Sequence, residues 1–318
     1  VLYFLFGEVD FGRRKLEQLK AIEARLPRVV PGVRPVRTAD LPATQAFARA
    51  AASNGFDPVP GNTAELAADS DDAILRLVAD IDAAQDHVHL LFYIWLEDGN
   101  GTRVLEAVRR AAERGVTCRV MVDALGSRKL AQSRAWADLS KSGVKTGLAF
   151  GFRLALLHMF FARVDIRNHR KIAVIDGRVA YVGSQNCADA AFLPKRKYAP
   201  WVDILARMEG PITWQLQSLF AEDWELHTGE DLSALLEQRV APAAGGQVAA
   251  VAMGTGPDDG FEAVPDTAAA LFAAARERLV ITTPYYVPNE MVQQSICAAA
   301  LRGVHVTMIL PQRNDSFV

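Results

Sequence analysis

The most informative stretch of the chain is NHRKIAVIDGRVAYVGSQN, residues 168–186. Two runs of β-branched and apolar residues flank Asp176-Gly177, and an Asp-Gly pair in that setting is a strong signal for a β-hairpin. His169 and Lys171 are two residues apart on the first predicted strand, so their side chains are expected on one face. The sequence therefore predicts a hairpin that presents an imidazole beside an ammonium group.

The second predicted strand ends in small and polar residues near the open end of the same hairpin. Gly183 has no side chain, so it permits a close backbone approach. Four polar side chains are expected to come together there: His169, Lys171, Ser184 and Asn186. An imidazole can attack phosphorus and leave again, while a lysine, an amide and a hydroxyl can hold the non-bridging oxygens. This set suits phosphodiester chemistry.

An ordinary buried hairpin with a surface His and Lys is the alternative, and for His-x-Lys alone it is the favoured one. The full pattern is His-x-Lys-x4-Asp-x6-Gly-Ser-x-Asn, which fixes six positions. With each residue type near one in twenty, chance would produce it in about 10⁻⁵ of chains of this length. The complete pattern is therefore a specific signal for a catalytic hairpin.

Outward from the hairpin, apolar periodicity predicts alternating helices and strands. On the N-terminal side these are a helix around 74–81, a strand over 88–95, a helix over 102–114 and a strand over 116–122. The same order returns as a helix over 267–278, a strand over 279–286, a helix over 289–302 and a strand over 304–310. The repetition indicates a duplicated α/β unit, and the alternation alone predicts a largely parallel sheet.

The remaining segments suggest the domain limits. Residues 1–6 are apolar and Gly12-Arg13-Arg14-Lys15 follows, a pattern typical of a membrane helix meeting the cytoplasm, although a buried first strand is an alternative. A short amphipathic helix ended by Pro27 is expected next, then mostly irregular chain over 28–70. An Ala-, Gly- and Pro-rich linker over 232–265 joins the two copies.

Composition limits the class of protein. The 318 residues are half apolar, with a formal net charge of −2, which counts against a dedicated nucleic-acid binder. The three cysteines, Cys118, Cys187 and Cys297, are far apart and suggest free thiols in a reducing compartment. No His, Cys, Asp or Glu cluster has metal-ligand spacing, so neither a metal nor another cofactor is expected.

The motif over 169–186 resembles the signature of the phospholipase D superfamily, and the chain as a whole resembles bacterial cardiolipin synthases. Nearly the whole chain takes part, with matching words at Gly7-Glu8, Phe92-Tyr93-Ile94-Trp95, Trp201-Val202-Asp203, Met208-Glu209-Gly210-Pro211, Asp223-Trp224, 283–288 and 309–316.

The resemblance implies a definite fold and domain plan. It implies two duplicated α/β sandwich domains with mixed sheets flanked by helices. The expected divisions are a membrane-helix stump and juxtamembrane helix over 1–35, a first domain with the complete motif over 36–235, and the start of a second over 236–318. The second copy is expected to be incomplete, because the counterpart of His169 would fall after Val318.

The resemblance also implies a mechanism in which two such motifs meet. His169 would be the nucleophile that attacks one phosphatidylglycerol, and a second phosphatidylglycerol would accept the phosphatidyl group and give cardiolipin. Lys171 and Asn186 would bind phosphate oxygens with support from Ser184. Asp203 would orient the imidazole.

Asp176 completes the catalytic set that the resemblance implies. Its position at the hairpin turn favours a stabilising role over proton transfer.

Phosphatidylglycerol and membrane lipid are the implied partners, with no nucleic acid. The bacterial inner membrane is the implied location, with the catalytic part facing the cytoplasm. Since the second motif is expected to lie outside the chain, residues 1–318 alone are expected to have little transferase activity unless two chains pair.

Three other functions stay open: a phospholipid hydrolase that uses water as acceptor, a nuclease of the same superfamily, and a module that binds anionic lipid without turnover.

Outside the motif, His158 is expected in a solvated loop, and His87 and His89 are expected to be structural. The aromatic runs 92–95 and 285–286 are expected in sheet cores.

Overall fold

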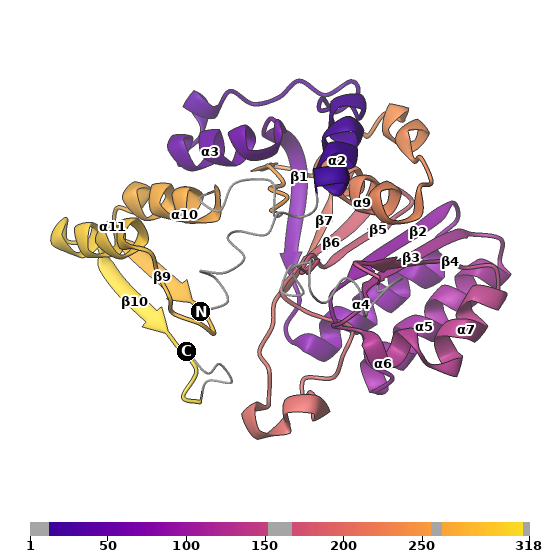
Figure 1. Ribbon diagram of the computed structural model, residues 1–318. Helices are drawn as coiled ribbons and strands as arrows, with labels where there is room; N and C mark the ends of the chain where they lie inside the picture. Colours follow the sequence, from indigo (N-terminus) through magenta and orange to yellow (C-terminus); the bar gives the residue numbers. More distant parts are fainter. Residues whose placement is uncertain (1–12, 152–166, 256–262, 314–318) are drawn as a thin grey trace.

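The computed structural model describes residues 13–151, 167–255 and 263–313. Its centre is an eight-stranded mixed sheet with the spatial order β4-β3-β2-β5-β6-β7-β1-β8 (Figure 1). In chain order the strands are β1 (Val59–Leu66), β2 (His87–Phe92), β3 (Thr117–Asp123), β4 (Lys145–Ala149), β5 (Ile172–Ile175), β6 (Val179–Gly183), β7 (Leu205–Glu209) and β8 (Val248–Ala250).

Helices cover both faces of this sheet (Figure 1). One face carries α4 (Ser70–Ala83), α5 (Gly99–Glu113), α6 (Arg128–Ala131) and α7 (Arg134–Lys141), and the other carries α9 (Ile212–Thr228) with α2 (Arg13–Arg25) packed on it. Side chains alternate along β2, so Leu90 and Phe92 join one hydrophobic core and Leu91 joins the other. The predicted α/β sandwich with helices flanking a mixed sheet is confirmed.

The hairpin β5–β6 turns at Asp176-Gly177. Both residues have positive φ, 52° and 62°, as the predicted two-residue turn requires. At its open end Gly183 approaches the next strand closely, because an added Cβ would lie 2.1 Å from the carbonyl oxygen of Ile204. The hairpin prediction is confirmed, with one correction: β5 begins only at Ile172, so residues 168–171 form an irregular lead-in to the strand.

The C-terminal part repeats the order helix, strand, helix, strand. It consists of α10 (Ala263–Ala274), β9 (Arg278–Thr282), α11 (Glu290–Leu301) and β10 (His305–Ile309). β9 and β10 pair in parallel, as β2 and β3 do in the first copy. α10 packs against α11 and against α3 (Thr44–Asn54), so this part lies beside α3 (Figure 1).

The prediction of irregular chain over 28–70 was wrong. That stretch holds a 3₁₀ turn (Thr38–Asp40), the Ala-rich helix α3, and β1. β1 exists because it pairs antiparallel with β7 on one side and β8 on the other, contacts that local sequence does not show. The expectation of a largely parallel sheet was also wrong for the eight-stranded sheet, in which the pairs β2–β3 and β3–β4 are parallel and the other five adjacent pairs are antiparallel.

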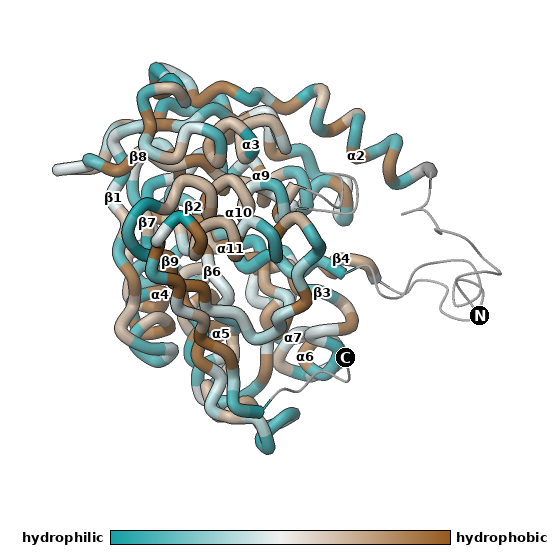
Figure 2. Tube along the Cα trace, turned by 90° about the vertical axis from the view of Figure 1, so that its left-hand side faces the viewer, coloured by the Kyte–Doolittle hydropathy of each residue, from teal (hydrophilic) through white to brown (hydrophobic). Residues whose placement is uncertain are grey.

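The predicted amphipathic helix is α2, in which short apolar and polar stretches follow one another along the helix (Figure 2). Ile22 and Leu26 are buried in the same core as α9.

No helix among the described residues is both long and apolar enough to span a bilayer. Residues 1–12 and His158, which carried expectations from the sequence, lie outside the described ranges. Two further 3₁₀ segments are η2 (Leu193–Tyr198) and η3 (Ser233–Glu237).

Candidate active site

His169 sits in the lead-in to β5 and faces Tyr93, the first residue after β2. The two rings are stacked, with centroids 3.9 Å apart and an angle of 17° between their planes. Although His169 is exposed, partial desolvation lowers its pKa and the Lys171 ammonium lowers it further, while the carboxylate of Asp123 acts in the opposite direction. The imidazole is therefore held in one orientation and biased toward its neutral form.

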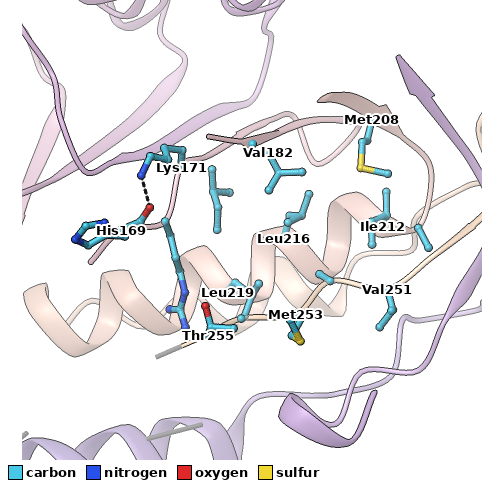
Figure 3. Close-up of a pocket in the computed structure, with 16 residues that line it drawn as sticks. His169, Lys171, Val182, Met208, Ile212, Leu216, Leu219, Val251, Met253 and Thr255 are labelled. Carbon is cyan, nitrogen blue, oxygen red and sulfur yellow. Dashed lines mark hydrogen bonds between the residues drawn. The ribbon is translucent and has the colours of Figure 1, made fainter. Parts of the chain in front are cut away.

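Lys171 lies near the same aromatic ring. Its Nζ is 5.3 Å from the centroid of Tyr93 and donates a hydrogen bond to the carbonyl oxygen of His169 at 2.6 Å (Figure 3). Desolvation lowers the pKa of Lys171 to about 8, against the opposing effect of the Asp203 carboxylate. At neutral pH the side chain is still mostly a cation, so it can bind a phosphate oxygen.

Asp203 and Ser184 form a hydrogen-bonded pair. The Ser184 hydroxyl donates to Oδ1 of Asp203 at 2.7 Å and accepts from the backbone N–H of Ile204 at 3.1 Å. Burial raises the pKa of Asp203, opposed by the Ser184 hydrogen bond and by Lys171. The pair thus lies beside Lys171 and fixes the loop between β6 and β7.

Asp203 was expected to orient the imidazole of His169. Its hydrogen bond goes to Ser184, and the carboxylate that acts on the pKa of His169 is Asp123. Asp123 ends β3 and is fully buried. One of its oxygens accepts the N–H groups of Leu125 and Gly126, and the other accepts the N–H of Asn168, the residue before the histidine, at 3.2 Å.

Asn186 is buried and ties the hairpin to the end of β2. Its Oδ1 accepts the backbone N–H of Ile94 at 2.9 Å, and Trp95 forms a parallel bridge with Cys187. The segment that carries Tyr93 is therefore held against the end of β6. With its oxygen engaged by Ile94, the amide NH₂ of Asn186 is the part left for a phosphate.

Asp176 lies at the turn, the opposite end of the hairpin from His169. Its carboxylate accepts three backbone N–H groups, from Gln85, Asp86 and His87, at 2.8–2.9 Å. The structure therefore does not bring Asp176 together with the other predicted site residues. Its contacts are those of a brace between the hairpin and the start of β2.

His89 is fully buried, with Nδ1 3.0 Å from Gln217 Oε1 and Nε2 3.1 Å from an Arg119 nitrogen. These contacts fit the structural role expected for it. Among the described residues no group of three or more His, Cys, Asp or Glu side chains could hold a metal ion.

Two residues of the site were missed by sequence reasoning. Tyr93 was assigned to the sheet core with its neighbours, yet only Phe92 and Trp95 of that run are fully buried. Asp123 had a weak signal, since it is a carboxylate at the carboxyl end of a buried strand, close to where α/β sites form.

The fold and this hairpin site together define a phospholipase-D-type protein. Phosphatidylserine synthase from Haemophilus influenzae has a similar structure, with a TM-score of 0.52 and 14% sequence identity over 93% of this chain and 66% of that one. That likeness concerns the fold alone.

Sequence comparison gives the family. Residues 77–224 match the family described as "Cardiolipin synthase, PLD-like domain". Cardiolipin synthase A of Proteus mirabilis is 34% identical over 331 residues, which cover 100% of this chain and 67% of that protein. Cardiolipin synthase A of Yersinia pseudotuberculosis serotype IB is 34% identical over 328 residues with the same coverage. The chain belongs to the cardiolipin synthase family and is a phosphatidyltransferase of the phospholipase D superfamily.

Proposed function

We propose that this protein makes cardiolipin by transferring a phosphatidyl group from one phosphatidylglycerol to the terminal hydroxyl of another. Its family supports this reaction. The observation that carries the residue assignment is the stacking of His169 on Tyr93 with Lys171 beside the same ring. That arrangement supports the assignment, because it brings an imidazole and an ammonium group to one aromatic ring.

His169 is the proposed nucleophile. Its pKa is lowered by desolvation and by Lys171, so at neutral pH the imidazole carries a lone pair that can attack phosphorus. The attack forms a phosphatidyl-histidine as the P–O bond to glycerol breaks, and the departing glycerol oxygen takes a proton from a general acid, the role expected for the histidine of a second such motif. The hydroxyl of the second phosphatidylglycerol then displaces the histidine and takes the phosphatidyl group.

Lys171 and Asn186 are the proposed ligands for the non-bridging phosphate oxygens, with Ser184 supporting. A cation and an amide donor fixed in place stabilise the charge that develops on phosphorus without reorganising in the transition state. The hydrogen bond from Ile94 to Asn186 supports this role, because it fixes the side-chain amide in advance, and the Ser184–Asp203 pair holds the loop beside Lys171.

The proposed location is the bacterial inner membrane, with the catalytic part on the cytoplasmic side. The support is the order of apolar residues 1–6 followed by basic residues 13–15, and the lipid nature of the proposed substrate.

Lipid mass spectrometry tests the function directly. The full-length gene product is expressed in cells that lack cardiolipin, next to its His169→Ala variant, with equal expression in the membrane fraction and circular dichroism of the purified proteins as the control for folding. Wild type is expected to restore cardiolipin and the variant is expected to restore none. Phosphatidic acid without cardiolipin would show that water is the acceptor and would contradict the proposal.

A further inference from the structure

A cavity of about 270 Å³ opens beside His169 and Lys171 and runs beneath the sheet (Figure 3). The catalytic pair lies at one end, and Met208, Ile212 and Val251 lie at the other (Figure 3). Apart from its polar end, the lining is dominated by apolar side chains from β5, β6, β7, α9 and residues 250–255.

The wall formed by residues 250–255 is fixed in place. The Ala252 N–H donates to Oε1 of Gln215 at 2.8 Å, and the Ala252 carbonyl accepts from Asn54 Nδ2 at 3.3 Å. Gln215 in turn donates to the Asp57 carbonyl at 2.7 Å. Because buried polar groups hold this segment, Val251 and Met253 form a defined apolar wall.

The ionisable side chains that line the cavity are all basic. The titratable residues that line it are His169, Arg170 and Lys171, and no carboxylate lines it within the described part of the chain. Arg170 is paired with Asp223 at 2.8 Å, which leaves the catalytic pair as the groups that face an anion. The cavity therefore runs from an anion-binding end to an apolar end.

We propose that this cavity binds an acyl chain of the lipid whose phosphate lies at His169. This inference rests on the proposed function, and it names the part of the substrate that the apolar end selects. A phospholipid has the same order as the cavity, an anionic phosphate followed by a hydrocarbon chain. A methylene group is about the size of a water molecule, which occupies about 30 Å³ in the liquid. The cavity therefore has room for on the order of nine methylene groups.

It follows that Val251 and Met208 limit the chain length that the enzyme accepts. Both line the cavity at the end away from the catalytic pair, so a larger side chain there would shorten the space without touching the chemistry (Figure 3). One methylene in an apolar pocket changes specificity by about tenfold or more.

The test is a competition between dioctanoyl- and dipalmitoylphosphatidylglycerol in the same detergent micelles, with the cardiolipin products separated by mass. The full-length gene product is compared with Val251→Phe and Met208→Phe. Val248→Phe is the matched control, because Val248 is an exposed residue of β8 that does not line the cavity. Val251→Phe and Met208→Phe are expected to shift the product ratio toward the short chain by about tenfold, and the control is expected to keep the wild-type ratio.

An unchanged ratio in folded Val251→Phe and Met208→Phe would overturn the inference. If the larger side chains prevent folding, Val251→Ala replaces them, with an expected shift toward the long chain, and a wild-type ratio there overturns the inference as well. Failure of wild type to make cardiolipin from either donor would count against the proposed function. The cavity is then judged by fluorescence binding of pyrene-labelled phosphatidylglycerol, which Val251→Phe must weaken.

Discussion

The imidazole of His169 stacks on the phenol ring of Tyr93, with the ring centroids 3.9 Å apart. Tyr93 follows β2 and His169 precedes β5, and β2 and β5 are antiparallel neighbours in the sheet. The antiparallel pairing therefore brings the end of β2 to the start of β5, and with it the two rings to the same end of the sheet. The aromatic ring limits the rotation of the imidazole, which reduces the entropy lost when the histidine attacks phosphorus.

Tyr93 should act as a positioning residue. Tyr93→Phe retains the ring and is expected to keep activity within a few-fold of wild type. Tyr93→Leu removes the stack and is expected to lower kcat by about 10- to 100-fold with a smaller effect on KM, because orientation is lost while Lys171 still binds phosphate. Steady-state kinetics on both variants check this, and equal losses for Phe and Leu would show that the hydroxyl matters instead.

The pH profile should have an alkaline limb set by Lys171. Its pKa is lowered to about 8, so the cation that binds phosphate is lost as pH rises through that value. Lys171→Arg keeps its charge at all accessible pH values, so in this variant the limb should move upward, even though total activity falls. Rates measured from pH 6 to 10 decide, and an unmoved limb would assign it to another group.

Asp203 should tune that limb. Its carboxylate opposes the lowering of the Lys171 pKa, so removing the charge with Asp203→Asn is expected to move the alkaline limb to lower pH. Ser184→Ala is the companion variant, because it breaks the hydrogen bond to Asp203 but keeps the carboxylate. A limb that moves in Ser184→Ala as far as in Asp203→Asn would argue against a charge effect.

Asp123 should set the acidic side of the profile. Its negative charge raises the pKa of His169, so Asp123→Asn is expected to lower that pKa further, and activity should then persist to lower pH than in wild type. The Asn side chain still offers an oxygen to the N–H groups of Leu125 and Gly126, which protects the local fold. NMR titration of the His169 ring gives the direct measurement, and a raised pKa would refute the assignment.

Asp176 should matter for stability. Its carboxylate accepts three backbone N–H groups, and Asp176→Ala leaves them without that partner, at an expected cost of about 2 kcal/mol in the free energy of unfolding. Denaturant unfolding measures the loss, and kcat of the folded variant is expected to stay near wild type. A folded Asp176→Ala with normal stability but no activity would restore the catalytic reading of this residue.

Local sequence determined much of this fold and site. The Asp176-Gly177 turn and the helix that ends before Gly115 follow from contacts within a few residues, and the strands that repeat in the second copy follow from local apolar patterns, which are the features that propensity and periodicity encode. The spacing of the motif likewise predicted that a hairpin would present His169 and Lys171 together.

Only the tertiary structure decided which groups surround that pair. β1 became a strand because β7 and β8 flank it, and Tyr93 and Asp123 joined the site because β2 lies next to β5 and β3 lies next to β2 in the sheet order. Such contacts join segments far apart in the chain, and no local pattern fixes which strand ends will meet. The same holds for the acidic partner of His169, since the distances between charges, set by the packed sheet, decide which carboxylate acts on the imidazole.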